Sequence, residues 1–296
     1  MQVNFHALVR PDKLAVAEPL WMPSVQLCLQ RFSGAHIPRN VSAIATSKGR
    51  IGVLEQGSGD TSIVFLHGVG SDKSVWAPQL EYFGRTRRSV AFDYPGYGDS
   101  DPAPDGMTRE DFAEAILAAM DSLGIGDAHV CGLSLGGVIA IALHAAAPMR
   151  CRSLILADTF AVHPDGRAIY ERSVAGSQDL RGMAEARVDV LLAQPADVGH
   201  RIDTVETMSR IDPAAYRIGA EAVWLANQRD RAAAIDVPTL VICGAEDKVT
   251  PPSLSHALVE LIPGAHYAEI AGAGHLTNVE KADEFNTLVE EFIGNG

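Results

Sequence analysis

The chain has 296 residues, of which 47% are hydrophobic and 21% charged, as in a soluble globular protein long enough for one large α/β domain or two smaller ones. Its formal net charge of −13 at pH 7 repels phosphates, so we expect neither nucleic acid nor an anionic membrane as a partner. No CxxC pair occurs among the four cysteines, which favours buried free thiols in a cytoplasmic, reducing compartment over disulfides or a zinc site: Cys28, Cys131, Cys151 and Cys243.

The first forty residues differ from the rest of the chain. Leu14 to Gln30 is fairly apolar, as a signal peptide would be, but Glu18, Pro19 and Pro23 interrupt it and it is too short to span a bilayer. We predict that residues 1–40 form an extension that packs on the body of the protein or on a partner subunit. A homo-oligomer therefore stays open.

From residue 43 onward, strand-like and helix-like segments alternate. A hairpin of edge strands is predicted for Ala43–Thr46 and Ile51–Glu55, and a helix should begin after Thr108, whose N-cap pattern includes Asp111. Short apolar runs predict buried strands at Ser62–Leu66, Ser89–Phe92, Ala128–Cys131, Ser153–Leu156, Thr239–Cys243 and Tyr267–Ile270. Helical patterns follow at Val138–Ala147 and at Ala282–Ile293, whose apolar face holds Phe285, Leu288, Val289 and Phe292. This alternation predicts an α/β protein with a mainly parallel sheet covered by helices on both sides.

One long segment interrupts the alternation. Residues 159–231, the inserted segment, hold only polar and alanine-rich helical stretches, and about seventy residues are too many for a simple connection. We predict a helical cap here, with the core formed by residues 41–158 and 232–296. Trp224 and Leu225 would either face a pocket or anchor the cap to the core, and anchoring is the more common role of such a pair.

The most informative motif runs from Cys131 to Gly137, where Ser134 stands between Gly132 and Gly136. Gly-x-Ser-x-Gly at a strand-to-helix turn is the pattern of a nucleophile elbow, in which a strained serine projects from the sheet edge. An apolar strand precedes this motif and an apolar helix follows it. Ser134 is therefore the predicted nucleophile.

A serine nucleophile needs a base and an acid that orients the base. Asp247 follows the predicted strand Thr239–Cys243, and His275 follows the last strand in a glycine-rich loop, so both belong to the edge that carries Ser134. Asp158, at the end of an earlier strand, is a competing acid, and Glu246 is expected to point elsewhere. His256 and His266 lie beside apolar segments and are interpreted as structural.

The oxyanion that develops during acyl transfer needs backbone N–H donors. Leu135, directly after the nucleophile at a helix N-terminus, and Val69, in the loop His67-Gly68-Val69-Gly70, are the predicted donors. His67 is interpreted as a structural hydrogen-bonding residue. The sequence has no metal-ligand cluster, GxGxxG or Walker pattern, so no cofactor or metal is expected.

Five motifs in this order resemble the α/β-hydrolase superfamily, over about residues 43–293. They are His67–Gly70 with Trp76, Asp93–Ser100, Gly132–Gly137, Gly244–Asp247 and Gly274-His275. Gly132–Gly137 and the tail His275–Glu280 are similar to 3-oxoadipate enol-lactonases and to related lactonases and esterases. The resemblance implies a capped serine hydrolase acting on a small-molecule carboxylic ester or lactone.

The chain also departs from that resemblance. A typical enol-lactonase lacks the forty-residue extension, and its dianionic substrate would need local cations in so acidic a protein. The arginines of the inserted segment include seven candidates for that role, although such residues usually serve solubility: Arg167, Arg172, Arg181, Arg187, Arg201, Arg210 and Arg217.

Other activities of the fold stay open to different degrees. Dehalogenases and epoxide hydrolases use an aspartate nucleophile, which Ser134 disfavours. Hydrolases that cleave carbon–carbon bonds in ring-fission products keep a serine triad but usually have a Ser-Gly-Pro-Gly first loop, and they are the second choice. A non-catalytic ligand receptor on the same scaffold is the third.

Overall fold

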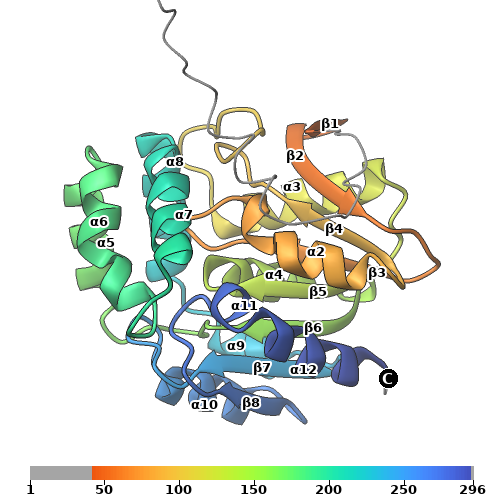
Figure 1. Cartoon of the computed structure of the whole chain (residues 1–296). Coiled ribbons are helices and arrows are strands. Elements are labelled where there is room, and N and C mark those ends of the chain that lie inside the picture. The colour runs from red at the N-terminus through yellow and green to blue at the C-terminus, as the bar shows by residue number, and fades with distance from the viewer. Residues whose placement is uncertain (1–41, 295–296) are drawn as a thin grey trace, which may run out of the picture. The chain divides into compact units, whose positions relative to one another are not determined.

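Within residues 42–294, the part of the chain that the computed structural model describes, eight strands form one sheet in the order β1-β2-β4-β3-β5-β6-β7-β8 (Figure 1). The extension predicted for residues 1–40 lies outside the described residues. The strands are β1 Ala43–Thr46, β2 Gly49–Gln56, β3 Ser62–Leu66, β4 Arg88–Phe92, β5 Ala128–Leu133, β6 Cys151–Ala157, β7 Thr239–Gly244 and β8 His266–Ile270. Every strand predicted from an apolar run is present, with ends that differ by no more than two residues.

The sheet is parallel from β4 through β3, β5, β6 and β7 to β8, whereas β2 runs in the opposite direction and pairs antiparallel with β1 on one side and with β4 on the other. All residues of β3 and of β7 are buried, as expected for strands covered on both faces. The predicted hairpin is present, because β1 and β2 pair antiparallel, but only β1 is an edge strand. β2 lies inside the sheet, because its other side pairs with β4.

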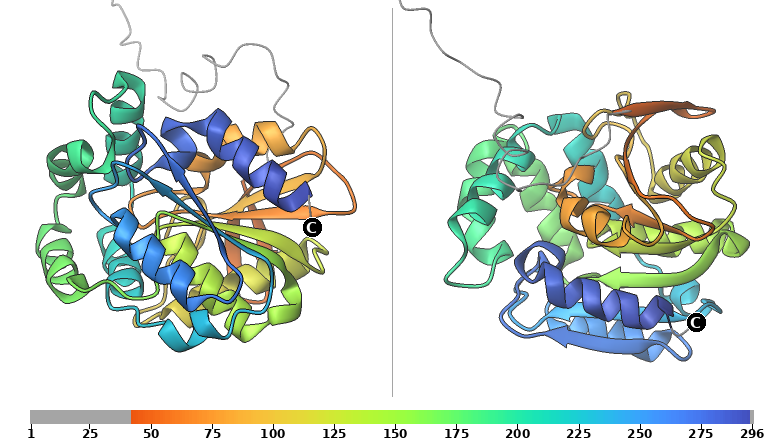
Figure 2. Two further views of the ribbon diagram at one scale, coloured as in Figure 1. Left: turned by 90° about the horizontal axis from the view of Figure 1, so that it is seen from below. Right: turned by 45° about the vertical axis from the view of Figure 1, so that its right-hand side comes forward.

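Helices cover both faces of this sheet (Figures 1 and 2). The core-forming helices are α2 Ala77–Phe83, α3 Arg109–Ser122, α4 Leu135–Ala146, α10 Pro252–Leu261 and α12 Ala282–Gly294, with short turns at η1 Lys73–Trp76, η2 Pro148–Arg150 and α11 Thr277–Glu280. Side chains of α2 and α12 belong to one apolar cluster with β3 and β7, and those of α3, α4 and α10 belong to the other. The predicted capping box of α3 is confirmed, since Thr108 and Asp111 bond each other's backbone N–H groups.

The buried side chains of α12 agree in part with the apolar face predicted for this helix. Phe285 and Val289 are buried, whereas Leu288 and Phe292 are half-buried at the margin of the same cluster. Ile293 completes the buried side of the helix. The helix therefore attaches the end of the described chain to the sheet through one apolar stripe.

The inserted segment between β6 and β7 contains helices and no strand. They are α5 Gly166–Gly176, α6 Leu180–Leu191, α7 Val198–Ser209, α8 Pro213–Trp224 and α9 Arg229–Ala233, which extends two residues past position 231. Figure 2 shows α5 to α8 grouped beyond the carboxyl ends of the central strands. Trp224 is buried and stacks on Phe160 at 5.8 Å, just after β6, with His163 edge-on to it at 5.7 Å. Trp224 also belongs to the apolar cluster that holds α3 and α4 of the core, which fits the anchoring interpretation.

Two expectations from composition can be compared with residues 42–294. Cys131, Cys151 and Cys243 are buried free thiols, as predicted, and burial raises the pKa of each, that of Cys151 to about 12; Cys28 lies outside the described residues. The longest described helix, α3, has 14 residues. None of the described helices combines the length and apolarity that crossing a bilayer requires.

Candidate active site

Ser134 occupies the tight turn between β5 and α4. Its φ of 55° and ψ of −113° lie in a region that side chains other than glycine avoid, which costs on the order of 1–3 kcal/mol. A Cβ at Gly132 would come closer than 3 Å to the backbone of Gly136, and a Cβ at Gly136 closer than 3 Å to the carbonyl of Leu66. The two glycines of the motif are thus required by the close passage of the chain, and Ser134 is held at the sheet edge.

The N-terminus of α4 begins directly at this serine. Gly137 and Val138 donate their N–H groups to Ser134 O at 3.0 and 3.2 Å. The N–H groups of Leu135 and Gly136 precede them, in the first turn where a helix has no carbonyl partner to offer. Leu135 N–H therefore lies where the positive end of the helix dipole can stabilise an anion.

The second predicted donor, Val69, lies in a loop packed against the nucleophile. A Cβ on Gly68 would be 3.5 Å from Ser134 Cβ. His67 is fully buried, and its Nδ1 lies 2.8 Å from Gly68 O, to which it donates. Burial lowers the pKa of His67 despite nearby Asp93, which keeps the ring neutral. This bond fixes the peptide that carries Val69 N–H, so His67 acts structurally, as predicted.

A buried ion pair between Lys73 and Asp93 stabilises the same loop. Asp93 accepts from the backbone N–H of Lys73 at 2.8 Å and from Lys73 Nζ at 2.6 Å, and Asp99 accepts from the same Nζ at 2.6 Å. Asp93 also accepts from Asp99 N–H at 2.9 Å. The motif Asp93–Ser100 therefore fastens the chain after β4 to the turn that follows Gly70.

His275 and Asp247 are joined directly. His275 Nδ1 lies 2.8 Å from Asp247 Oδ2, and both side chains are buried. Burial alone would lower the pKa of His275, but the charge and hydrogen bond of Asp247 outweigh it and the pKa is raised. Burial correspondingly works against ionisation of Asp247, yet His275 and the bonds below keep the pKa of Asp247 lowered. The pair therefore favours a charged imidazolium beside a carboxylate.

Asp247 is oriented by the turn that follows it. Its Oδ1 accepts from the N–H groups of Val249 at 2.7 Å and Thr250 at 2.9 Å, and its Oδ2 accepts from Thr250 Oγ1 at 2.6 Å. These bonds fix the carboxylate rotamer so that Oδ2 faces His275. Thr250 is a residue that sequence reasoning missed, although Asp-x-x-Thr after a strand is the spacing of a side-chain-stabilised turn.

Asp158, the competing acid, is buried next to this pair but bonds elsewhere. Its Oδ1 accepts from Gly244 N–H at 2.9 Å and its Oδ2 from Thr277 Oγ1 at 2.5 Å. It also has a φ of 48°. The hydrogen-bonding partner of His275 is thus Asp247 and not Asp158.

The other residues weighed for the site lie apart from it. Glu246 is exposed, in keeping with the expectation that it points elsewhere. His256 and His266 are exposed as well, and each contacts one aromatic ring, Tyr267 at 4.3 Å and Phe292 at 6.2 Å. The structural interpretation of these two histidines is therefore supported only by one ring contact each, at the surface.

One set of metal-ligand atoms lies close together in the described part of the chain, formed by Asp158, Cys243 and Asp247. All of them already bond to protein groups: the carboxylates as described above, and Cys243 Sγ to the carbonyls of Gly244 and Thr250. These atoms stabilise the loops around His275, and each of them already has a hydrogen-bond partner in the protein.

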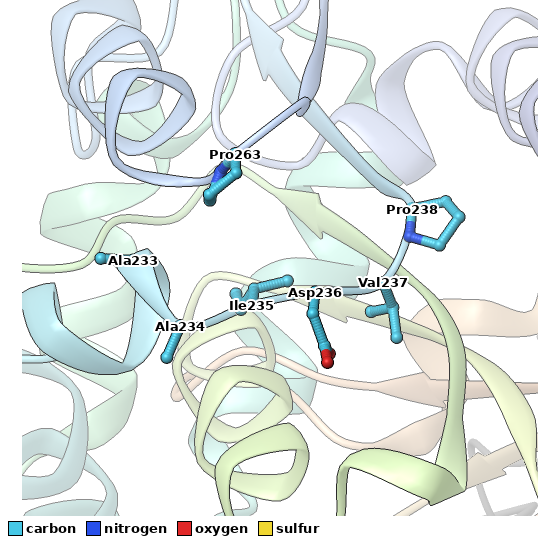
Figure 3. A pocket seen from close by; sticks show the side chains of 7 residues that line it. All are labelled: Ala233, Ala234, Ile235, Asp236, Val237, Pro238 and Pro263. Carbon is cyan, nitrogen blue, oxygen red and sulfur yellow. The ribbon is translucent and has the colours of Figure 1, made fainter.

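Two surface pockets lie away from Ser134. One of about 490 Å³ is lined by residues 233–238 and Pro263, before β7 begins, whereas Asp247 follows the end of β7 (Figure 3). Its one charged lining residue, Asp236, bonds to His144 Nε2 at 3.1 Å. The other, about 310 Å³, lies between α6 and α7. Neither pocket contains a predicted catalytic residue.

The arginines of the inserted segment differ in their surroundings. Arg181 pairs with Glu206, Arg201 with Asp189 and Arg210 with Asp72, so these three are neutralised at the surface. Arg187, on α6, is half-buried and donates to the neutral hydroxyl of Tyr216 at 3.4 Å. Its charge also opposes protonation of His275, which places it near the histidine.

Comparison with known proteins agrees with this geometry. The model of the alpha/beta hydrolase fold family matches residues 61–282, and the chain belongs to that family. It is 29% identical to a dihydrolipoyllysine-residue acetyltransferase component of an acetoin cleaving system from Cupriavidus necator, over 83% of this chain and 67% of that protein. It is 28% identical to 3-oxoadipate enol-lactonase 1 of Acinetobacter baylyi, over 78% of this chain and 88% of the relative. The crystal structure of the enol-lactonase from Burkholderia xenovorans LB400 superposes with a TM-score of 0.79 at 28% identity, covering 85% of this chain and 99% of that one. The α/β-hydrolase fold and the likeness to enol-lactonases are therefore confirmed, and the protein is a hydrolase of this family.

Proposed function

We propose that the protein is a serine hydrolase that cleaves a carboxylic ester or a lactone through an acyl-enzyme on Ser134. His275 takes the proton of Ser134 Oγ as the hydroxyl attacks the substrate carbonyl, and Asp247 stabilises the imidazolium that forms. The N–H groups of Val69 and Leu135 hold the oxyanion of the tetrahedral intermediate. No cofactor or metal takes part in this scheme.

The first half of the reaction ends when the leaving group departs, and the second half repeats these roles with water. His275 gives its proton to the departing alkoxide, which leaves as an alcohol or, from a lactone, remains attached to the acyl group as its opened hydroxyl end. His275 then takes a proton from water, whose oxygen attacks the acyl-enzyme and releases the carboxylic acid. Ser134 recovers its hydrogen in the last step.

One observation carries the proposal: a serine with φ of 55° lies on the same sheet edge as a buried His–Asp pair 2.8 Å apart. Strain at Ser134 persists only where the surrounding structure fixes it, and such strain gathers at functional sites. A histidine whose pKa is raised by a buried carboxylate, here Asp247, is suited to act as a general base.

The inserted segment supports a cap over this site. Tyr97 OH donates to Ala215 O of α8 at 3.4 Å, and a Cβ on Gly219 of the same helix would press on Tyr97 and on Val69. His275 N–H donates to Leu191 O at the end of α6 at 2.7 Å. Helices of residues 159–231 thus contact the loops of both Val69 and His275, and we assign them the selection of substrate.

Arg187 supports a substrate that carries a carboxylate. It belongs to α6, whose last residue, Leu191, accepts from His275 N–H, and its charge opposes protonation of His275. Its partner Tyr216 belongs to α8, which contacts the Val69 loop. A half-buried guanidinium that is bonded only weakly to a hydroxyl, on helices that contact these two loops, is suited to bind an anion in two-point fashion.

Three alternatives share the scaffold. Carbon–carbon bond hydrolysis of ring-fission products would use the same triad, and transfer of the acyl group to a thiol or alcohol in place of water is the version that the acetyltransferase relative raises. A non-catalytic receptor would keep the fold without turnover. The cytoplasmic compartment and the absence of nucleic-acid or membrane partners remain predictions from composition. A small-molecule substrate remains what the family resemblance implies.

A labelling experiment tests the proposal. A fluorophosphonate should modify Ser134 and no other residue, and Ser134→Ala should lower kcat on lactones and aryl esters by several orders of magnitude while the protein stays folded. Turnover of vinylogous diketones in place of esters would favour the carbon–carbon alternative. Labelling at another residue, or near-normal turnover by the alanine variant, contradicts the assignment.

A further inference from the structure

Glu280 sits at the end of α11, five residues after His275, and its carboxylate binds three backbone N–H groups. Oε1 accepts from Gly274 at 3.0 Å and from Leu276 at 3.2 Å, the two neighbours of His275. Oε2 accepts from Ala193 of the inserted segment at 2.7 Å. Each of these bonds is charge-assisted, because the acceptor is a carboxylate oxygen.

The N–H group of His275 itself is also held. It donates to Leu191 O at 2.7 Å, so three consecutive N–H groups, those of residues 274, 275 and 276, are bonded to Glu280 or to the end of α6. The two chains touch directly here, since a Cβ on Gly274 would lie 2.7 Å from both Ala193 N and Leu191 O. The backbone on either side of the histidine is therefore fixed by contacts from outside its own loop.

If His275 is the general base, as proposed above and as this inference requires, these contacts place Glu280 where it can influence catalysis without touching the reacting atoms. We propose that Glu280 is a positioning residue, which sets the backbone of His275 for catalysis and, through the same carboxylate, couples the inserted segment to the histidine loop. Displacement of Ala193 when the segment moves would be transmitted to Gly274 and Leu276 through two oxygens of one rigid carboxylate.

The bond pattern predicts a graded series of variants. Glu280→Ala leaves the N–H groups of Gly274, Leu276 and Ala193 without their acceptor. Glu280→Gln keeps one carbonyl oxygen, which can serve the histidine loop or the inserted segment but not both, because its amide nitrogen is a donor facing a donor. Small errors in placing a catalytic group cost up to about a hundredfold in rate. We expect the rate of fluorophosphonate labelling at Ser134 to fall by about tenfold to a hundredfold in Glu280→Ala, with Glu280→Gln between it and the wild type.

Two further readouts separate this role from simple stabilisation. The far-downfield proton resonance of His275 Nδ1–H, identified by its loss in His275→Gln, should shift or broaden in Glu280→Ala at temperatures well below its unfolding transition. Amide hydrogen exchange should quicken both around Ala193 and around Gly274. The exposed Glu284 of α12 supplies the control, Glu284→Ala, which should change none of the three measurements.

The outcomes distinguish the two proposals. If Ser134 is not the nucleophile, labelling fails in the wild type too, while the resonance and the exchange still report on Glu280. A Glu280→Ala protein with an unchanged resonance and unchanged labelling rate overturns the positioning role. Faster exchange at only one of the two segments overturns the coupling. Should Glu280→Ala fail to fold, the same criteria apply to Glu280→Gln, whose side chain has nearly the same shape.

Discussion

Asp158 and Thr277 form a buried hydrogen bond between residues 119 positions apart, with Thr277 Oγ1 2.5 Å from Asp158 Oδ2. Because Asp158 also accepts from Gly244 N–H, it ties the end of β6 to the end of β7 and to the chain just after His275. The carboxylate that competes for the acid role in the sequence thus holds the loops together. Its neighbour Asp247 is left to bond the imidazole.

Substituting the two aspartates separates these roles. Asp247→Asn should lower kcat/KM by about four orders of magnitude, because the imidazole loses the carboxylate that orients it and stabilises its charge. Asp158→Asn should cost no more than about tenfold, since an amide can still accept from Gly244 N–H and donate to Thr277 Oγ1. Steady-state kinetics on one aryl ester measure both, and a larger loss in Asp158→Asn would reverse the assignment of the acid.

Asp158 should also affect stability through its titration. Burial and the nearby charge of Asp247 raise its pKa to about 8, from an ordinary value of about 3.9 in an unfolded chain. Between these two values the unfolded state releases the proton and the folded state retains it. This group therefore lowers the free energy of unfolding as pH rises from about 4 to 8.

Asp158→Asn removes that penalty. The free energy of unfolding of the variant minus that of the wild type should increase by more than about 1 kcal/mol from pH 5 to pH 8. Urea denaturation of both proteins at the two pH values can measure this change. A difference between the two proteins that does not vary with pH would show that Asp158 is ionised in the folded state.

The pH dependence of the reaction should follow His275. Its pKa is raised, burial being outweighed by Asp247, and the base must be neutral to act. Activity should therefore fall as pH drops through a midpoint above the ordinary histidine value of about 6.5. In Asp247→Asn the residual activity should persist to lower pH, because the carboxylate that raises the pKa is gone. A profile of kcat/KM against pH checks the direction, and an upward move of the midpoint in the variant would contradict it.

The elbow glycines should be sensitive to a single methyl group. In Gly132→Ala the added Cβ meets the Gly136 backbone closer than 3 Å, and backbone at a packed turn cannot move aside cheaply. We expect a loss of about 3 kcal/mol in stability, or roughly 10 °C in the melting temperature of a chain of this size. Gly126→Ala is the matched control, because nothing lies within 4 Å of its Cβ position. Equal melting temperatures for the two variants would refute the close-passage explanation.

How well the sequence predicted these features depends on how far apart the interacting residues lie along the chain. A strand such as Ser62–Leu66 has five consecutive buried residues, and the triad motifs each occupy a few adjacent positions, so both are visible locally. The contacts of Glu280 with Ala193, 87 residues away, and of Asp158 with Thr277 depend on how loops meet after folding. No local pattern encodes such pairs. Half-burial of Arg187 was equally hidden, because its sequence neighbours resemble those of the surface-paired Arg181.

Arg187 and Arg181 provide the test of substrate charge. Both belong to α6, but Arg181 is exposed and paired with Glu206, whereas Arg187 is half-buried and donates to Tyr216 of α8. Arg187→Ala should lower kcat/KM for an ester that carries a free carboxylate by roughly thirtyfold, or about 2 kcal/mol, because a partly desolvated charge-assisted pair is lost. Arg181→Ala should change the same rate by less than about twofold, as a surface pair contributes little.

The neutral ester of the same acyl group completes the comparison. Arg187→Ala should leave its kcat/KM nearly unchanged, since the side chain makes no contact with the reacting carbonyl in the proposed scheme. Extending the series to five more arginines of the inserted segment locates any second anion contact: Arg167, Arg172, Arg201, Arg210 and Arg217. If all seven alanine variants hydrolysed the acidic and the neutral ester at wild-type rates, a carboxylate-bearing substrate would be ruled out. The inserted segment would then select by shape and apolar contact, as expected of an esterase or lactonase for uncharged substrates.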